Sequence, residues 1–509
     1  MTAQLEPAPT RSSRPLPAVT ELCRRLTAAE VSYCHWKSNE HLRPATIGET
    51  DLDLLVARDS APLVEEILAE TGYRRMTAPP ARSYIGIEDY LAMDGATGKL
   101  IHLHLHYRLV LGEKFLKGYR LPWEERLLSS RRLDAETGLY VSAPELELIV
   151  LLVRGALKHR RRDTLGFGSG PLDGDFLREF RWLAKRIDPV KLRTETTELL
   201  GAPAAALLEQ IVARGVDSPG LARFRVAIRN VTDSYRTYSP AEATRRRWSR
   251  EWQARWARFR SRWSGRRPIV RFSNPRGGLI IAFLGADGSG KSTVTSVIAS
   301  WLSWRMEVVP LYFGFGDGPV SPMRRPLQSL KSLYSRRASE SKAGSEGNVT
   351  RTTTSWRGVP RAMWRTLWSW SIVREKEGRL REAQRARNLG LIAICDRYPQ
   401  GQIMGLGDGP LLGHWNQHPW GWLRAAARWE LSAYRSMEAV VPDLVIKLQV
   451  SPEVSAGRKE DVSLESLARR IEVVNRVEFP SGAKVVAVDS NRPLEQVLLD
   501  VKRLVWEAL

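Results

Sequence analysis

Gly285-Ala-Asp-Gly-Ser-Gly-Lys-Ser-Thr293 is the segment that most strongly indicates a fold. It follows the apolar run 279–284, which is short enough for a buried strand, and precedes 294–302, which has helical character. A glycine-rich loop between a strand and a helix is typical of a phosphate-binding loop, because its N–H groups and the helix N-terminus point at phosphate oxygens. The alternative is a structural glycine turn, and the flanking elements favour nucleotide binding. The predicted ATP-binding residues are Gly285, Gly288, Ser289, Gly290, Lys291, Ser292 and Thr293.

A second apolar strand, 390–395, ends in Asp396-Arg397-Tyr398. At the carboxyl end of a parallel strand beside a phosphate loop, an acid is expected to hold magnesium-bound water. Ser292 and Asp396 are therefore the predicted metal-binding residues, and Lys291 is predicted to reach the β- and γ-phosphates. The planar guanidinium group of Arg397 is suited to gripping a phosphate. These residues predict ATP and Mg2+ as cofactors.

The composition indicates a protein of two or three domains with an anionic partner. The chain has 509 residues, of which 43% are hydrophobic and 26% charged, values that are ordinary for a globular protein. Its net charge of +22 favours nucleotide phosphates, nucleic acid or an acidic membrane surface as partners, and does not choose among them.

The sequence shows no targeting signal, and this together with its few cysteines predicts a cytoplasmic protein. Residues 1–17 are rich in proline and polar residues, so a disordered leader is expected in place of a signal peptide. No apolar run of the sequence approaches the length of a membrane-spanning helix. Cys23, Cys34 and Cys395 form neither a metal-ligand spacing nor an even set of pairs, which is simplest to explain in a reducing compartment.

Two predicted strands of the N-terminal region carry polar residues at alternating positions. Asp51 and Asp53 point to one face of the first strand, where two carboxylates can hold magnesium. The run 99–106 alternates strictly, and three imidazoles on one of its faces could ligate a metal. Without another Cys or His nearby, we expect these histidines to be hydrogen-bonded or solvated on a half-buried strand. They are His102, His104 and His106.

With these residues, the region 18–165 resembles the nucleotidyltransferase fold, in which a small-residue turn precedes a strand bearing Asp-x-Asp and a later strand supplies a third acid. The resemblance implies an α+β domain with a second site at Asp51 and Asp53. This chain has Lys37-Ser38 in place of the usual Gly-Ser turn, and histidines on the strand expected to carry the third carboxylate. We therefore expect a degenerate substrate-binding or structural domain rather than active nucleotidyl transfer.

Residues 166–272 are predicted to be a helical linker region with a basic, tryptophan-rich helix at 245–267. The aromatic residues recur every three or four positions and line one helix face, while arginines cover the rest. Such a helix could lie on an anionic membrane, bind nucleic acid, or bury its indoles against the protein's own domains. We expect burial, with a weaker anion affinity on the arginine face. The aromatic residues are Trp248, Trp252, Trp256, Phe259 and Trp263.

The motifs of residues 275–509 resemble those of thymidylate kinase. They are the phosphate loop with Asp287, then Asp396-Arg397-Tyr398, then Pro442-Asp-Leu-Val-Ile-Lys-Leu-Gln-Val-Ser-Pro-Glu453. The resemblance implies a parallel sheet flanked by helices and transfer of the γ-phosphoryl group of ATP to a nucleoside monophosphate. Two segments differ from the family, Tyr312-Phe-Gly-Phe-Gly316 and 399–410, and both lie where the family binds its acceptor. The acceptor is therefore left open.

The same resemblance assigns roles to individual residues. Asp287 would contact the sugar hydroxyl of the acceptor, Arg397 its phosphate, and Lys291 the transferring group. The arginines after Glu453 would form a lid. The catalytic residues implied in this way are Lys291, Asp396, Arg397 and Arg458, and the acceptor-binding residues are Asp287, Arg397 and Tyr398.

The sequence as a whole predicts an α/β protein that transfers a phosphoryl group from ATP to a small-molecule acceptor. The alternative is a nucleotide-binding regulatory or scaffold protein without phosphoryl transfer. The sequence leaves open whether the chain forms a homodimer, and residues 335–356 are expected to be a flexible insertion. The predicted regions are a leader at 1–17, a nucleotidyltransferase-like domain at 18–165, a helical linker at 166–272 and a P-loop kinase-type domain at 273–509.

Overall fold

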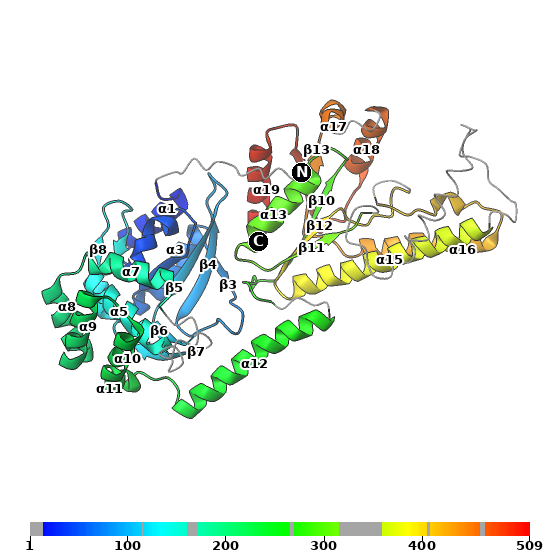
Figure 1. The fold of residues 1–509 in the computed structure, drawn as a ribbon. Coiled ribbons are helices and arrows are strands. Elements are labelled where there is room, and N and C mark those ends of the chain that lie inside the picture. The colour runs from blue at the N-terminus through cyan, green and yellow to red at the C-terminus, as the bar shows by residue number, and fades with distance from the viewer. Residues whose placement is uncertain are drawn as a thin grey trace. The chain divides into compact units, whose positions relative to one another are not determined.

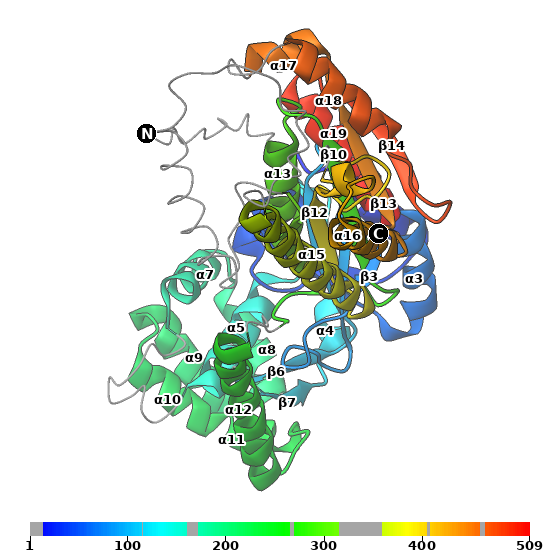
Figure 2. The same cartoon turned by 90° about the vertical axis from the view of Figure 1, so that its right-hand side faces the viewer.

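The computed structural model describes residues 14–113, 116–159, 172–264, 269–314, 359–404, 408–458 and 464–509. The chain forms two compact units, Met1–Phe272 and Ser273–Leu509, whose elements are shown in Figures 1 and 2. The predicted insertion and most of the predicted leader lie outside the described residues. Among the helices described, none is both long and apolar enough to cross a bilayer.

The first unit is built on a mixed sheet whose described strands run in the order β3-β4-β5-β2-β1-β9-β8. The predicted strands that carry Asp53 and His104 are confirmed, and they are parallel neighbours with these two residues in register. The bounds are β1 (Tyr33–His35), β2 (Leu52–Val56), β3 (Arg74–Met76), β4 (Ile87–Met93), β5 (Leu100–His106), β8 (Arg132–Leu133) and β9 (Tyr140–Val141), with β6 (Leu109–Glu113) and β7 (Leu116–Leu121) as a separate antiparallel pair.

Alternation along β2 and β5 gives this sheet one apolar and one polar face. Leu52 and Leu54 of β2, with Leu103 and Leu105 of β5, enter a core that α1 and α3 also line. The residues between them, Asp53 and His104 among others, face the opposite side. The helices and turns of this part are α1 (Pro17–Ala28), η1 (Asn39–His41), α2 (Leu42–Thr46), η2 (Arg58–Ser60), α3 (Ala61–Glu70), α4 (Glu124–Ser129) and α5 (Pro144–Lys158).

The helices that follow α5 share a core with it. Phe176, Leu208 and Phe224 pack in one cluster with the apolar residues of α5, so these helices are an integral layer of the first unit. Aspartates at 173, 188 and 217 cap three of them by accepting hydrogen bonds from the first-turn N–H groups. The bounds are α7 (Gly174–Ala184), α8 (Pro189–Leu200), α9 (Ala202–Arg214), α10 (Ser218–Ala227) and α11 (Arg229–Ser234).

The basic, tryptophan-rich helix is α12 (Pro240–Ser264), and its described aromatic residues are exposed. The exposed fractions of Trp248, Trp252, Trp256 and Phe259 are 61%, 60%, 52% and 51%. Trp252 stacks on Trp256 and Trp256 on Phe259, with ring centroids 6.2 and 5.6 Å apart. These four residues follow one another at helical spacing along one face of α12, and we call them the aromatic stripe.

The prediction that these indoles are buried was therefore wrong. Helical spacing puts Arg245 and Arg255 beside the aromatic stripe, so covering it would also remove guanidinium groups from water, which costs several kcal/mol for each charge that loses its solvent without gaining a partner. The side chain of Trp263 lies outside the described residues.

The second unit has a parallel sheet whose described strands run in the order β11-β12-β10-β13-β14. From β10 the chain builds one side of the sheet through β11 and β12, and then crosses to β13 and β14 on the other side. Ligands of open parallel sheets bind at the carboxyl ends of the strands beside such a reversal. The bounds are β10 (Leu279–Gly285), β11 (Val308–Tyr312), β12 (Ile392–Asp396), β13 (Leu444–Gln449) and β14 (Lys484–Asp489).

Helices cover both faces of this sheet (Figure 1). α13 and α19 pack on one face, and α15 with its neighbour α16 packs on the other, where Val373 and Tyr434 join the strand residues in a common core. The bounds are α13 (Lys291–Ser303), α15 (Val359–Asn388), η4 (Gly413–Trp415), α16 (Gly421–Glu438), α17 (Pro452–Arg458), α18 (Leu464–Arg476) and α19 (Leu494–Ala508).

Candidate functional site

The phosphate loop connects β10 to α13 and needs glycine at two of its positions. Gly288 has φ +79°, and a Cβ atom added there would lie 2.7 Å from Oγ of Ser455. Gly290 has φ +78° and is the N-cap of α13. Glycine adopts these backbone conformations without the strain that other residues incur. The loop therefore presents its N–H groups and the N-terminus of α13 in the arrangement of an anion site.

Lys291, Ser292 and Asp396 meet beside this loop. Nζ of Lys291 is 3.7 Å from Oδ1 of Asp396, and the hydroxyl of Ser292 donates a 3.4 Å hydrogen bond to Oδ2. The parallel pairing of β10 with β12, which aligns Phe283 with Asp396, brings the acid to the loop. Burial, and next the positive charge of Arg397, lower the pKa of Lys291. An ammonium group in this setting would be stabilised by an anionic ligand.

The donor atoms of Ser292 and Asp396 suit Mg2+. Oδ1 of Asp396 is buried and receives no hydrogen bond from the described residues. A carboxylate with an unsatisfied oxygen beside a hydroxyl is the chemistry that a hard cation or its bound water requires. The two residues predicted to bind metal are thus brought together, and their chemistry fits the ion.

Two arginines and two aspartates form a network of ion pairs at the phosphate loop. Nη2 of Arg397 is 3.6 Å from Oδ1 of Asp287, and Nη1 is 3.2 Å from Oδ2 of Asp408. Arg470, from α18, forms an ion pair with Oδ2 of Asp287. The carboxylate of Asp287, predicted to contact a sugar hydroxyl, is thus engaged by two guanidinium groups. Guanidinium groups in such positions are suited to binding a phosphate or carboxylate group.

Asp408 and Lys376 belong to this site and were missed in the sequence analysis. Asp408 is 5% exposed and has φ +67°. Lys376, on α15, donates a 2.8 Å hydrogen bond to the main-chain carbonyl of Asp408. Burial lowers the pKa of Lys376 to about 8. Charged residues are frequent throughout α15, so its local pattern does not single out the lysine that points inward.

Two other predicted residues have structural partners. The guanidinium of Arg458 donates to the carbonyl of Gly288 at 3.1 Å and to that of Ser490 at 3.2 Å, so it braces the phosphate loop. The predicted lid continues into 459–463, outside the described residues. The hydroxyl of Tyr398 donates to the carbonyl of Val440 at 2.6 Å. Tyr398 is 2% exposed and its ring packs beside Phe313 and Phe479. With Phe479 it lines a cavity of about 460 Å³.

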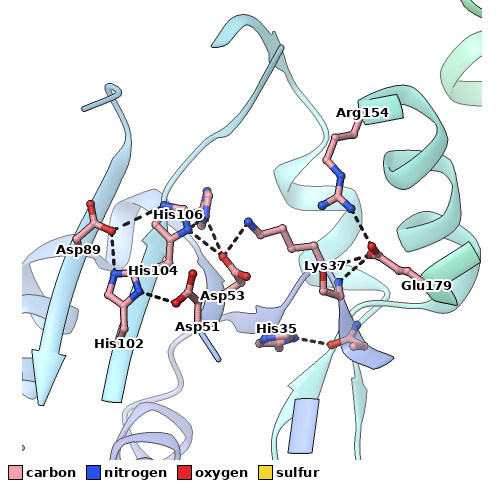
Figure 3. Close-up of polar contacts among 12 residues, drawn as sticks. His35, Lys37, Asp51, Asp53, Asp89, His102, His104, His106, Arg154 and Glu179 are labelled. Atoms are coloured by element: carbon pink, nitrogen blue, oxygen red, sulfur yellow. Dashed lines mark hydrogen bonds and ion pairs between the residues drawn. The ribbon is translucent and has the colours of Figure 1, made fainter. Parts of the chain in front are cut away.

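A second charged cluster lies on the polar face of the sheet in the first unit (Figure 3). Oδ1 of Asp53 is 2.9 Å from Nζ of Lys37, 2.9 Å from Nδ1 of His104 and 3.6 Å from Nε2 of His106. Burial opposes ionisation of Asp53, but Lys37 and the histidines hold its pKa well below the usual value. Burial lowers the pKa of His104 and, more strongly, that of His106, which favours the neutral form of both rings.

His102 bridges two carboxylates in the same cluster. Its Nδ1 is 2.8 Å from Oδ1 of Asp51, and its Nε2 is 3.0 Å from Oδ1 of Asp89. Burial disfavours the charged ring, but the two hydrogen bonds outweigh burial and raise the pKa of His102. Asp51 and Asp53 therefore lie on the predicted common face, but each is paired with a histidine of β5.

The expectation that these histidines are hydrogen-bonded is confirmed, since His102 contacts Asp51 and Asp89 and His104 contacts Asp53. Their face is more buried than expected, because His102 and His106 are only 3% and 1% exposed. β5 carries no carboxylate, as the sequence indicated, but Asp89 of β4 lies opposite His104 in the antiparallel pair β4–β5 and adds an acid to the cluster. Which residues face each other across a sheet depends on how its strands pair, so the pattern along β5 could not show that an acid of β4 lies next to its histidines.

The Lys37-Ser38 turn is held by residues of the helical layer. Ser38 has φ +56°, and its N–H donates to Oε1 of Glu179 at 3.1 Å. Arg154 of α5 pairs with the other carboxylate oxygen of Glu179 at 2.8 Å (Figure 3). This anchoring fixes the turn from which Lys37 reaches Asp53.

No protein-family model matches the chain. Two proteins of Escherichia coli (strain K12) are similar to it. "Uncharacterized ATP-binding protein YghS" is 27% identical over 238 residues, which are 45% of this chain and 93% of that protein. "Uncharacterized ATP-binding protein YghR" is 27% identical over 228 residues, 44% of this chain and 86% of that protein.

Among solved structures, the deoxyadenosine kinase of M. mycoides with bound dATP is 16% identical, with 44% of this chain and 98% of that chain covered and a TM-score of 0.25. The strand order and loop geometry of the second unit themselves make it a parallel α/β sheet with a phosphate loop.

Proposed function

We propose that the second unit binds Mg-ATP and transfers the γ-phosphoryl group to a small anionic acceptor. The observation that carries this proposal is the meeting of Lys291, Ser292 and Asp396 at the carboxyl ends of β10 and β12. A cation, a hydroxyl and an acid at the mouth of a phosphate loop are the groups that phosphoryl transfer needs. The two Escherichia coli relatives, which are described as ATP-binding, support the donor.

The chemistry would rest on positioning and charge neutralisation. Lys291 would stabilise the negative charge that develops on the transferring group, and α13 would direct its N-terminus at the phosphates. Ser292 and Asp396 would hold Mg2+, which neutralises phosphate charge when bound. Arg458, which contacts the loop at Gly288, would keep the loop in its anion-binding form.

The acceptor side favours a phosphorylated molecule. Arg397 and Arg470 both approach Asp287, so two planar cations lie at one edge of the phosphate loop. Guanidinium groups bind phosphate with paired hydrogen bonds, and the aspartates orient them before an acceptor arrives. A nucleoside monophosphate is the first candidate, because the sequence motifs resemble those of thymidylate kinase.

An acceptor screen tests the proposal. Purified protein with Mg-ATP is incubated with nucleoside monophosphates, sugars, sugar phosphates and lipid head groups, and ADP release is measured. The proposal predicts that at least one phosphorylated acceptor stimulates ADP release, and that Lys291→Ala abolishes the stimulation. ATP binding without stimulation by any of these classes would favour the alternative, a nucleotide-binding regulatory or scaffold protein.

Donor binding has its own readout in a thermal melt. ATP at about 100 times its Kd stabilises a protein by roughly 2.7 kcal/mol, and Lys291→Ala should remove most of this effect. Stabilisation by ATP that is unchanged in Lys291→Ala would contradict the predicted role of this lysine. Lys484→Ala, which changes an exposed lysine of the same unit, is the matched control.

A further inference from the structure

We propose that Asp53, His104 and His106 form a binding site for one divalent transition-metal ion in the first unit. The argument rests on the positions of three atoms. Nδ1 of His104 is 2.9 Å from Oδ1 of Asp53 and 3.3 Å from Nε2 of His106. Nε2 of His106 is 3.6 Å from Oδ1 of Asp53. The atoms thus form a compact triangle.

This triangle has the size that a metal ion imposes on its ligands. Nitrogen and oxygen ligands lie about 2.0–2.2 Å from zinc, so neighbouring ligand atoms are separated by roughly 3.0–3.5 Å in octahedral or tetrahedral geometry. The three observed separations span this range. An ion could therefore bind with side-chain movements of a few tenths of an ångström.

A carboxylate lies behind one of the two proposed imidazole ligands. The second nitrogen of His104, Nε2, faces Oδ1 of Asp89 at 3.9 Å, and His102 holds that aspartate at 3.0 Å. A carboxylate behind a ligating imidazole orients the ring and raises its affinity for the metal. Nδ1 of His106 is buried with no hydrogen-bond partner among the described residues, and edge contacts with Trp36 and His104 hold the ring in place.

The ligand set indicates the class of metal. Mg2+ prefers an all-oxygen shell, whereas two imidazoles with one carboxylate suit Zn2+, Mn2+, Fe2+ or another transition metal. Asp51 and Asp89, the other two acids of the cluster, are both engaged by His102. The site therefore differs from the pair of magnesium ions that an all-carboxylate cluster would hold.

Lys37 provides the internal competitor. Its ammonium group lies 2.9 Å from Oδ1 of Asp53, the same oxygen that the metal would use. A metal ion has to displace this cation, so removing the ammonium group should strengthen metal binding. A purely structural ion-pair cluster predicts no gain in metal binding, and only a loss of stability in the first unit, because Asp53 would lose the ion pair with Lys37.

The test uses tag-free, full-length protein stripped with a chelator and dialysed against Zn2+ or Mn2+ alone, without nucleotide. Metal per chain is measured by elemental analysis, and Kd by isothermal titration. We expect one tightly bound ion per chain, unchanged by millimolar Mg2+. Asp53→Asn and His106→Ala should each weaken binding at least tenfold, Lys37→Met should tighten it about tenfold, and His41→Ala, a histidine outside the cluster, should have no effect.

Cobalt gives a second readout that requires no variant. Co2+ added to the wild-type protein should produce the visible absorption bands of a site with nitrogen ligands, and Zn2+ should abolish them. Absence of these bands together with less than one Zn2+ or Mn2+ per chain would overturn the proposal. So would Zn2+ binding that is equal in the wild type, in Lys37→Met and in a folded Asp53→Asn variant.

Discussion

Arg397 and Asp408 form an ion pair with 3.2 Å between Nη1 and Oδ2, and both residues have a left-handed backbone, with φ +70° and +67°. A residue other than glycine in this region costs on the order of 1–3 kcal/mol and persists only where its surroundings impose it. Asp396, which precedes Arg397, reaches the phosphate loop. The strained turn therefore directs the side chain of Asp396 to the phosphate loop and that of Arg397 to Asp408, on two sides of one site.

The role of Asp408 follows from this pair. Asp408→Ala should raise the KM for the acceptor roughly tenfold, because Arg397 loses the carboxylate that orients it, while the KM for ATP stays within about twofold. Steady-state kinetics with the acceptor identified by the screen would measure both. Asp500→Ala, which removes an aspartate paired with Arg492 at the same unit's α19, serves as control. An equal loss in both KM values would contradict an acceptor-side role.

Arg397 itself is predicted to bind the acceptor and not ATP. A charge-assisted hydrogen bond contributes about 1.5–3 kcal/mol, so Arg397→Ala should raise the acceptor KM roughly tenfold to a hundredfold. ATP affinity, measured by titration calorimetry, should be nearly unchanged. If ATP affinity falls and the acceptor KM does not, the donor and acceptor ends of the site have been exchanged in our assignment.

Lys376 predicts a pH dependence of stability. Its pKa is about 8 in the folded protein and near 10.5 when exposed in the unfolded chain, so between these values the unfolded state binds more protons. Stability from this group therefore rises with pH, by up to about 3 kcal/mol over the window from pH 8 to 10.5. Below pH 8 both states carry the proton and the contribution is constant.

The comparison with Lys376→Met isolates this group. The free energy of unfolding of the wild type should increase relative to Lys376→Met as pH rises from 7.5 to 10, measured by urea denaturation. Lys484→Met, a substitution at an exposed lysine, should run parallel to the wild type. A constant difference between the wild type and Lys376→Met would show that Lys376 does not titrate in this range.

The aromatic stripe of α12 predicts a small effect on stability. Trp252 is 60% exposed, so Trp252→Ala should change the free energy of unfolding by less than about 0.5 kcal/mol. Trp36, which is 1% exposed in the core of the same unit, is the matched comparison, and Trp36→Ala should cost about 3–5 kcal/mol. Thermal melts of the two variants measure the two losses of stability. A large loss for Trp252→Ala would mean that the stripe is covered in solution.

The same stripe predicts affinity for an acidic membrane surface. Exposed indoles between arginines match the interfacial zone of an anionic bilayer, where rings enter the head groups and cations meet lipid charge. Wild-type protein should bind vesicles containing phosphatidylglycerol more tightly than neutral vesicles, and salt should weaken this binding. Trp252→Ala with Trp256→Ala should abolish it. Binding to duplex DNA with no vesicle binding would instead assign α12 to nucleic acid.

Local sequence determined the elements that build the phosphate site. An apolar run, a glycine-rich loop and a helical segment predicted β10, the loop and α13, because strand and helix periodicity and the φ preference of glycine act over a few residues. The position of Asp396 near the loop was predicted from the general arrangement of parallel sheets, because an acid at the carboxyl end of a neighbouring strand lies beside the loop. Strand alternation likewise predicted that Asp51 and Asp53 share a face.

Tertiary structure decided which distant residues meet. Asp89 joins Asp53 and His104 only because β4 and β2 flank β5 in the sheet, and that pairing depends on contacts between residues far apart in the chain. Lys376 lies against Asp408 because α15 packs beside the end of β12, and its helix pattern does not distinguish this lysine from the others. The exposure of the aromatic stripe was also a tertiary outcome. Periodicity shows which side chains share a face, but burial of that face requires a partner surface, and the cost of desolvating the arginines beside it opposes burial.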